Sequence, residues 1–467
     1  MWLQVNRNDK RTLTQQVYGQ IREKILSSEF KENEKLPSSR ELSQLLNVSR
    51  NVVIEVNEQL ISEGYLYVQE RSGTYVAEGV SFQKRPRMQA PPLEKTAVNV
   101  NKDMIDFKAG NPGIDRFPKK VWGKLSKEVC IDSPKETFSY HQPGGSEHLR
   151  KVLTDYLLRH RGIHCHQDQI VITSGATQGL SMLTNFLNKN QGEVAVEDPV
   201  TDEMRTIFTS AGKAVVPVPV DENGILTSQL PKESTPSFVF VIPSHQFPLG
   251  GTLPIQRRIQ LIEYAREMNT YIVEDDYDSE FTYDRSPVPA VYSLDDECVI
   301  YVGTFSKILS PALRIGYVIL PPHLVEGFRE LKWYTDRHSA SLDQGTLARF
   351  IEEGYMERHI RKMKRVYQKR RDTLVSAIQK AFPEAIIFGQ SAGMHLVVKL
   401  PKMNFNESLM RKLKKEGVIV YPVENYSLLK GDYCEHIVMG YGGLSVDEIE
   451  KGVEIIKKVV LNGVSND

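Results

Sequence analysis

Hydrophobic residues recur every four positions near the start of the chain, and this spacing predicts an amphipathic helix. The recurring residues are Leu13, Val17, Ile21 and Ile25. A segment with the pattern of a capping box, residues 38–41, then predicts the start of a second helix. Ser49 is placed to cap a third helix, whose buried side is predicted to carry Val52, Val53, Val56 and Leu60.

The residues after this third helix alternate between hydrophobic and polar. The alternation at 65–68, a polar tip at 70–73 and a short run at 74–76 predict a β-hairpin. Two short helices joined by a tight turn and followed by a hairpin are typical of a winged helix-turn-helix, whose second helix enters the major groove of DNA. In DNA recognition, an arginine side chain can pair with guanine and an asparagine side chain with adenine, and other arginines contact phosphate or the minor groove. The residues predicted to contact DNA are Ser38, Arg40, Ser49, Arg50, Asn51 and Arg71.

The charge of this first segment leaves a second interpretation open. Residues 1–78 hold ten Lys and Arg against eleven Asp and Glu, so the segment lacks the basic excess that is usual for a DNA-binding domain. Amphipathic three-helix modules also serve as protein contacts. The charges are unevenly placed, however, because the third helix begins with Arg50 and carries its acidic residues further along.

The remainder of the chain is predicted to form a linker and a larger domain. Residues 79–103 hold a basic cluster at 84–87 and little hydrophobic periodicity, which indicates an extended linker. Hydrophobic runs then alternate with helical patterns over 104–467, with a small subdomain expected at about 345–467. Buried strands are predicted at 170–173, 238–242 and 271–273, and each ends in polar residues, as ligand sites at the edge of a parallel sheet require.

Composition narrows the class of protein. A length of 467 residues favours two or three domains, and 40% hydrophobic with 25% charged residues is typical of a soluble protein. The formal net charge of zero favours neither nucleic acid nor a membrane as a partner of the whole chain. No segment resembles a signal peptide or a membrane span, so a cytoplasmic protein is expected. The four cysteines form no CxxC pair, and neither a disulfide framework nor a metal site is predicted.

A lysine at position 307 stands within a group of residues that fits pyridoxal 5'-phosphate (PLP). The lysine amine would form an imine with the cofactor, and a buried carboxylate would keep the pyridine nitrogen protonated. A phenol would bond the ring oxygen, while hydroxyls and a guanidinium would hold the phosphate. The residues predicted for these roles are Lys307, Asp275, Tyr277, Thr304, Ser306 and Arg314. Gly175, Ala176 and Thr177, between a predicted strand and a helix, would add backbone amides to the phosphate site.

Two segments of the chain carry a family resemblance. Residues 36–42 and 48–53 are similar to the DNA-binding signature of GntR-superfamily repressors. With a PLP site downstream, the whole chain from about 12 to 460 resembles the MocR-type branch, which includes GABA-sensing regulators. The resemblance implies an α+β winged helix-turn-helix joined to an α/β fold-type I aminotransferase-like domain with a mixed, mostly parallel sheet.

The resemblance also implies roles for individual residues. It supports Lys307 as the imine lysine and places His245 and Gln246, in the segment 243–250, near the ring oxygen of the cofactor. It matches Tyr140 to a tyrosine that reaches the phosphate of a neighbouring subunit. The sites of this family lie at a subunit interface, so a homodimer is expected. In MocR-type proteins the dimer is swapped head to tail.

Two departures from the family pattern bear on chemistry. Val200-Thr201 stands where the family usually has Gly-Tyr, so the tyrosine ring that stacks on the cofactor is missing. The stretch 437–443 lacks the arginine that clamps a substrate carboxylate in aminotransferases. Arg205 is the remaining candidate for binding an effector carboxylate. A dense basic segment at 358–371 is interpreted either as a solvated helix face or as a second DNA-binding track.

These observations predict a PLP-dependent DNA-binding transcriptional regulator. An amine or amino-acid effector would form an external aldimine at the PLP site and change binding to double-stranded operator DNA. The main alternative is an active aminotransferase whose N-terminal domain only tethers it to DNA. A third interpretation is a repressor in which the cofactor is structural. The missing clamp and Thr201 count against the enzyme, although Lys307, Asp275 and Tyr277 suffice for proton transfer.

Overall fold

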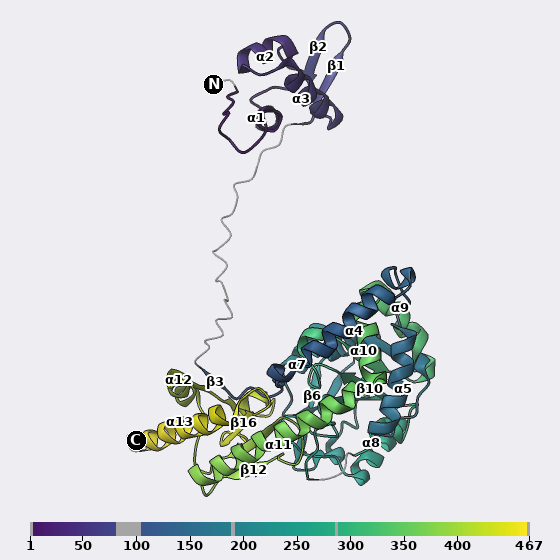
Figure 1. Cartoon of the computed structure of the whole chain (residues 1–467), viewed down its shortest axis with the longest axis vertical. Helices are drawn as coiled ribbons and strands as arrows, with labels where there is room; N and C mark the ends of the chain where they lie inside the picture. Colours follow the sequence, from purple (N-terminus) through teal and green to yellow (C-terminus); the bar gives the residue numbers. More distant parts are fainter. Residues whose placement is uncertain (1–2, 81–103, 188–191, 285–287, 465–467) are drawn as a thin grey trace. The chain divides into compact units, whose positions relative to one another are not determined.

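The structure is a computed structural model that describes residues 3–80, 104–187, 192–284 and 288–464. Its contacts divide the chain into two compact units, Met1–Val100 and Asn101–Asp467 (Figure 1). The basic cluster predicted at 84–87, and nearly all of the predicted linker, lie outside the described residues. No helix in the described ranges has the length and apolar character needed to cross a membrane.

The first unit is a three-helix domain with a β-hairpin. Its elements are α1 (Leu13–Leu26), α2 (Ser39–Leu46), α3 (Arg50–Ser62), β1 (Leu66–Gln69) and β2 (Gly73–Val76). β1 and β2 pair antiparallel, with Leu66 opposite Val76. Most of the predicted hydrophobic positions form the core, since Val17, Ile21 and Ile25 of α1 pack with Val53, Val56 and Leu60 of α3. Leu13 and Val52, which were predicted with them, are only partly buried and lie outside this core. The winged helix-turn-helix is therefore confirmed.

Local hydrogen bonds fix where α2 and α3 begin. The Ser38 hydroxyl accepts the amide of Glu41 at 3.3 Å, and the Glu41 carboxylate accepts the amide of Ser38 at 2.8 Å, which completes the predicted capping box. Asn47 ends α2 in the left-handed region at φ 49°, and the Ser49 hydroxyl accepts the amide of Val52 at 3.4 Å. The turn between the two helices is thus as short as a helix-turn-helix requires.

A large sheet organises the second unit. Its strands are β4 (Ile170–Thr173), β5 (Val194–Asp198), β6 (Val215–Asp221), β7 (Gly224–Ile225), β8 (Phe238–Val241), β9 (Tyr271–Asp276), β10 (Val299–Thr304) and β11 (Gly316–Ile319). Their order is β4-β11-β10-β9-β8-β5-β6-β7. The five strands from β10 to β6 run parallel, whereas β11 and β7 are antiparallel to their neighbours. This is the mixed, mostly parallel sheet that was expected.

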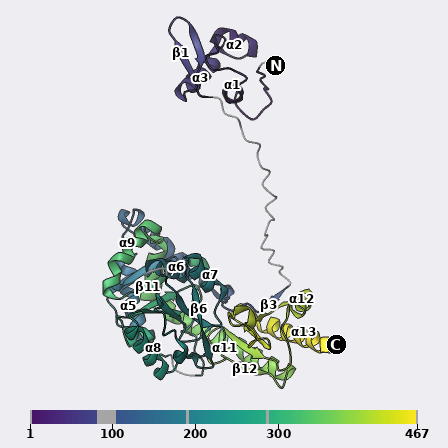
Figure 2. The same cartoon turned by 180° about the vertical axis from the view of Figure 1, so that it is seen from behind.

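Helices bury both faces of this sheet (Figures 1 and 2). Ile170 and Ile172 of β4 belong to one hydrophobic cluster and Val171 to another, because successive strand residues point to opposite faces. Continuous hydrophobic runs such as these are characteristic of parallel sheets covered on both sides. The helices are α4 (Lys119–Asp132), α5 (Glu147–Arg161), α6 (Ala176–Phe186), α7 (Asp202–Ser210), α8 (Ile255–Glu267), α9 (Val325–Thr335) and α10 (Ser341–Glu352).

A smaller antiparallel sheet, in the order β12-β13-β16-β15, lies in the C-terminal part of the chain. Its strands are β12 (Ile386–Phe388), β13 (His395–Lys399), β15 (Tyr421–Pro422) and β16 (His436–Gly440). A separate parallel pair joins β3 (Ile105–Asp106) to β14 (Val418–Ile419). The helices of this region are α11 (Tyr355–Ala381), α12 (Glu407–Lys415) and α13 (Val446–Val464).

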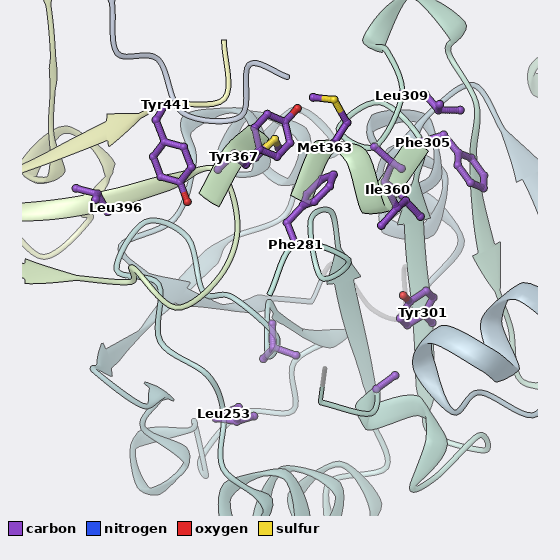
Figure 3. Close-up of a cluster of buried hydrophobic side chains, with 14 of the residues drawn as sticks. Leu253, Phe281, Tyr301, Phe305, Leu309, Ile360, Met363, Tyr367, Leu396 and Tyr441 are labelled. Atoms are coloured by element: carbon purple, nitrogen blue, oxygen red, sulfur yellow. The ribbon is translucent and has the colours of Figure 1, made fainter. Parts of the chain in front are cut away.

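The large sheet and the smaller antiparallel sheet share one hydrophobic cluster. Leu396 of β13 and Tyr441, which follows β16, belong to the same cluster as Phe281 and Tyr367 (Figure 3). The rings of Phe281 and Tyr367 meet edge to face, with centroids 4.9 Å apart. Because this core is continuous, the loops between the large sheet and the smaller sheet pack against hydrophobic residues of both sheets.

Candidate functional site

The predicted cofactor residues meet at one edge of the large sheet. β4, β5, β8, β9 and β10 end at this edge, and β11 begins there. A pocket of about 570 Å³ opens among the loops that follow, which is the usual place for a ligand in this type of sheet. The predicted residues that line it are Ala176, Thr177, Asp275, Tyr277, Thr304, Ser306, Lys307 and Arg314.

Lys307 follows β10 and reaches into the pocket. Its Nζ donates a hydrogen bond to the backbone oxygen of Gly110 at 2.8 Å. Gly110 has φ 74°, and a Cβ at this position would lie only 2.8 Å from Nζ, so the glycine leaves room for the lysine. Burial lowers the pKa of the Lys307 amine. A lowered pKa increases the fraction of neutral amine, which is the form that attacks a carbonyl.

Asp275, near the end of β9, is a buried carboxyl group with one oxygen, Oδ1, that lacks a hydrogen-bond partner among the described residues. Burial, reinforced by the negative charges of Asp276 and Asp278, raises the pKa of Asp275 to about 7, although Lys307 acts in the opposite direction. A cationic ring nitrogen at this point would supply the missing partner. The orphaned oxygen therefore fits the pyridinium of PLP.

The phosphate end of the cofactor also has a suitable site. Gly175 precedes α6 at φ 96° and offers no side-chain cap, so the first amides of this helix remain available to an anion. The Arg314 guanidinium lies beside this turn, because a Cβ on Gly175 would be 3.4 Å from it. The hydroxyls of Thr304 and Ser306 are 3.1 Å apart and line the same pocket. Together these groups fit a phosphate dianion.

Tyr277 presents its phenol to the pocket, and His245 stands behind it. The Tyr277 hydroxyl lies 3.3 Å from Nδ1 of His245 and 3.2 Å from the backbone oxygen of the same residue. His245 is buried and does not line the pocket. The side chain of Gln246 donates to the backbone oxygen of Pro199 at 3.1 Å instead of facing the pocket. Phe247 is the residue of this segment that does line it.

Two predicted residues do not line the pocket within this chain. Tyr140 is 74% exposed and packs under the guanidinium of Arg337, at 4.8 Å from its ring centroid. Arg205 forms an ion pair with Asp202 and donates to the backbone oxygen of Asn425 at 3.3 Å. Neither residue contributes to the lining.

Several residues that line the pocket were not predicted to bind the cofactor. Thr201 lines the pocket and also caps α7, where its hydroxyl accepts the amide of Met204 at 3.2 Å. Val438 is fully buried in β16, and Arg314 is the one arginine in the described lining. The pocket thus lacks a second guanidinium in the part of the chain that the structure describes. The lining residues that were not predicted include Lys108, Asn111, Glu203, Phe247, His395 and Tyr426.

The predicted DNA-contacting residues share the surface of the first unit. All six side chains are exposed. Nε of Arg50 lies 3.4 Å from the Ser39 hydroxyl. Arg71 stands at the tip of the hairpin with φ 59°. Ser38 and Ser49 use their hydroxyls as helix caps. Arg40, Arg50, Asn51 and Arg71 therefore remain the side chains best placed to contact bases and phosphates.

The dense basic segment of α11 divides between surface and interior. Arg361 and Lys362 are exposed, whereas Arg370 and Arg371 are buried. Arg370 donates to the backbone oxygen of Gly442, and Arg371 pairs with Asp284 at 2.5 Å. The two buried arginines thus hold the smaller sheet and the loops around it, and only part of the segment is available as a charged surface.

Comparison with known proteins assigns both units. Residues 13–76 match the family "Bacterial regulatory proteins, gntR family", and residues 102–456 match "Aminotransferase class I and II". The uncharacterized HTH-type transcriptional regulator YdeL of Bacillus subtilis is 34% identical over 97% of this chain and 98% of its own. The probable rhizopine catabolism regulatory protein MocR of Rhizobium meliloti is 32% identical over 96% and 93%. An archaeal alanine:glyoxylate aminotransferase structure superposes with a TM-score of 0.72 at 25% identity, covering 77% of this chain and 91% of its own.

These findings define a DNA-binding transcriptional regulator with an aminotransferase-like domain. The chain belongs to the MocR-type branch of the GntR family.

Proposed function

We propose that this regulator binds PLP through Lys307 and that an amine or amino-acid effector entering the same pocket changes its binding to operator DNA. The buried carboxyl group of Asp275, whose Oδ1 has no hydrogen-bond partner among the described residues, is the observation that carries this proposal. A carboxyl in this state is destabilising unless a cation meets it. Bound PLP supplies that cation and an aldehyde that condenses with amines.

Each remaining group of the pocket has a part in this proposal. Lys307 holds the cofactor until an effector amine takes its place, Tyr277 bonds the ring oxygen, and Arg314 with the start of α6 binds phosphate. The effector changes the fit between the parts of the second unit, and a homodimer, swapped head to tail, passes this change to the winged helices in the cytoplasm. Tyr140, which is exposed within one chain, would complete the phosphate site of the partner subunit.

The lining of the pocket argues against efficient transamination. An aminotransferase clamps the α-carboxylate of its substrate with an arginine, and the described lining offers only Arg314. Arg205, the earlier candidate for an effector carboxylate, is engaged with Asp202 and Asn425. Lys108 is a cation in the pocket beyond those assigned to the cofactor. A small amine with at most one carboxylate is therefore the proposed effector class.

The test is the visible absorption of the purified protein with PLP, recorded before and after addition of a panel of amines and amino acids. A band that shifts with one ligand and stays shifted, together with altered operator affinity, is the expected result. Conversion to pyridoxamine phosphate with a stoichiometric keto acid would identify an enzyme instead. If the cofactor is bound but no amine changes the affinity for operator DNA, the cofactor has only a structural role.

Arg50→Ala is expected to remove sequence preference from DNA binding. A bidentate arginine–guanine pair contributes about 1–3 kcal/mol of discrimination, so affinity for operator DNA falls roughly 5- to 150-fold while affinity for random DNA changes little. Arg71→Ala at the hairpin tip is the matched comparison, because a phosphate contact weakens binding to both DNAs alike. Fluorescence anisotropy at several salt concentrations measures both. Equal losses on operator and random DNA for Arg50→Ala would exclude a base contact.

A further inference from the structure

Behind Tyr277 lies a buried group of two histidines and an aspartate. His245 follows β8, Asp278 follows β9, and His395 begins β13 of the smaller sheet, and each is 1% exposed. Their donor atoms all lie within 4.8 Å of one another. His395 lines the pocket itself. Tyr277 connects His245 to the pocket, because its hydroxyl is 3.3 Å from Nδ1 of His245.

The strongest contact in the group joins His245 to Asp278. Nδ1 of His245 lies 3.1 Å from Oδ2 of Asp278. The other carboxylate oxygen, Oδ1, has no hydrogen-bond partner among the described residues, so the side-chain hydrogen bond of this carboxylate is the one with His245. Nε2 of His245 faces the backbone oxygen of Gly389 at 3.4 Å. Since a carboxylate only accepts hydrogen bonds, an ionised Asp278 requires a proton on Nδ1.

The surroundings hold this pair rigidly. Gly393 has φ 74°, and a Cβ there would lie 2.2 Å from Cε1 of His245 and 2.5 Å from Oδ2 of Asp278. Its backbone oxygen accepts hydrogen bonds from the hydroxyls of Tyr283 and Tyr441. The His395 ring packs on His245 at 4.7 Å between centroids, and its Nε2 lies 3.0 Å from the backbone oxygen of Pro248. The imidazole of His245 therefore has one available orientation.

The orientation matters because the Tyr277 proton has two possible directions. If Nδ1 of His245 carries no proton, it accepts the phenol proton and draws it away from the pocket. If Nδ1 carries a proton, it can only donate, and the phenol proton is left for the backbone oxygen of His245 or for an acceptor in the pocket. The ring oxygen of PLP is such an acceptor.

We propose that Asp278 and His245 are positioning residues for Tyr277: Asp278 fixes the His245 proton on Nδ1, which directs the Tyr277 hydroxyl toward the ring oxygen of the cofactor. This inference rests on the proposed binding of PLP. A donor to the ring oxygen stabilises its anionic form, so it lowers the pH at which the lysine-bound cofactor loses its proton. Charged or titratable groups that face Tyr277 and this pair are Glu197, Asp275, Asp276, Lys307 and His395.

The first experiment measures the pH midpoint of the visible band of the PLP-loaded protein. His245→Gln and Asp278→Asn are each expected to raise this midpoint by about one pH unit, which is a tenfold change in proton affinity. Tyr277→Phe is expected to raise it at least as far, and adding His245→Gln to Tyr277→Phe is expected to change nothing more. A shift of the same size in the Tyr277→Phe background would overturn the proposal, because His245 would then act independently of Tyr277.

His323→Gln is the matched control. His323 also contacts a tyrosine, with Nε2 2.9 Å from the Tyr271 hydroxyl, but this exposed pair does not line the pocket. The midpoint of this variant is expected to equal that of the wild type. Near-ultraviolet circular dichroism of every variant shows whether its tertiary structure is retained. If His245→Gln does not fold, Asp278→Asn still tests the pair, because asparagine has the same shape as aspartate.

A second experiment uses the cofactor-free protein, so it remains informative if the protein does not bind PLP. Nitrogen-15 spectra of histidine-labelled protein distinguish a proton on Nδ1 from one on Nε2, and the His245→Gln variant identifies the signal. A proton on Nδ1 that is lost or moved in Asp278→Asn supports the proposal. A lone proton on Nε2 would overturn it. So would one tightly bound divalent metal ion per chain that disappears in His395→Gln, because Nδ1 of His245 would then carry the metal.

Discussion

Lys307→Ala is expected to abolish the visible band of the PLP-loaded protein and every response of DNA binding to amines. The ratio of operator affinities with and without the effector falls to about 1, because no group remains for the effector to displace. Operator binding without effector persists, since the winged helix has its own core, which includes Val17, Val53 and Leu60. Absorption spectra and anisotropy titrations of the same samples measure both effects.

The control for this variant is Lys120→Ala, which removes an exposed lysine of α4. Its spectrum and effector response are expected to match those of the wild type. Lys108 is the other amine that lines the pocket. If Lys307→Ala keeps a normal band, and the band disappears only when Lys108 is also replaced, then Lys108 and not Lys307 binds the cofactor, and the proposed role of Lys307 is wrong. An effector response that survives without any band would contradict the role of the cofactor itself.

The sequence predicts the elements of this protein better than their arrangement. The strand Ile170–Thr173 and the helix caps at Ser38 and Ser49 were predicted because hydrophobic periodicity and capping are local properties. β9 continues to Asp276, beyond the predicted end at 273, because hydrophobicity stops at Val273 while pairing with β10 continues. Pairing between strands is a tertiary effect that a single strand's sequence does not contain.

The candidate site shows the same limit. Lys307 and Arg314 were found because they stand in one short motif, whereas Lys108 and His395 come from distant segments that only folding brings to the pocket. Asp276, adjacent to Asp275, forms an ion pair with Arg161 at 2.7 Å. Successive strand residues face opposite sides of the sheet, so the two neighbouring carboxyl groups have different surroundings. His245 lies behind Tyr277, where no spacing rule places it.

Asp275→Asn is expected to weaken PLP binding and, at the same time, to stabilise the cofactor-free protein. The loss of a hydrogen bond to a charged ring nitrogen is expected to reduce affinity by about 2 kcal/mol, roughly thirtyfold. Without PLP, however, Oδ1 of the wild-type carboxyl group has no hydrogen-bond partner among the described residues, so an amide of the same shape removes a buried charge. Equilibrium titration with PLP and urea unfolding of the cofactor-free protein measure the two effects separately.

The stabilising effect of Asp275→Asn has a defined pH dependence. Burial raises the pKa of Asp275 from its ordinary value of 3.8 to about 7 in the folded chain. Folding therefore favours the protonated carboxyl, and the stability that this group contributes is complete below pH 3.8 and is lost as the pH rises to about 7. The advantage of the asparagine variant should grow by about 1.4 kcal/mol per pH unit over this window and level off above pH 7. Glu197, whose pKa burial raises to about 8, is present in both proteins and largely cancels.

The substitution Asp276→Asn, at the neighbouring residue, is expected to destabilise the protein, in contrast to Asp275→Asn. Asp276 pairs with the buried Arg161, so its replacement leaves a buried cation without this partner and lowers the free energy of unfolding by about 3 kcal/mol at neutral pH. The same substitution at two adjacent aspartates of β9 thus changes the free energy of unfolding in opposite directions. Asp276 forms an ion pair within the fold, whereas Oδ1 of Asp275 has no hydrogen-bond partner among the described residues of the cofactor-free protein. A cofactor-free Asp275→Asn protein that is less stable than the wild type at pH 8 would show that the fold already neutralises Asp275, and the argument for a cationic ligand at that carboxyl would fail.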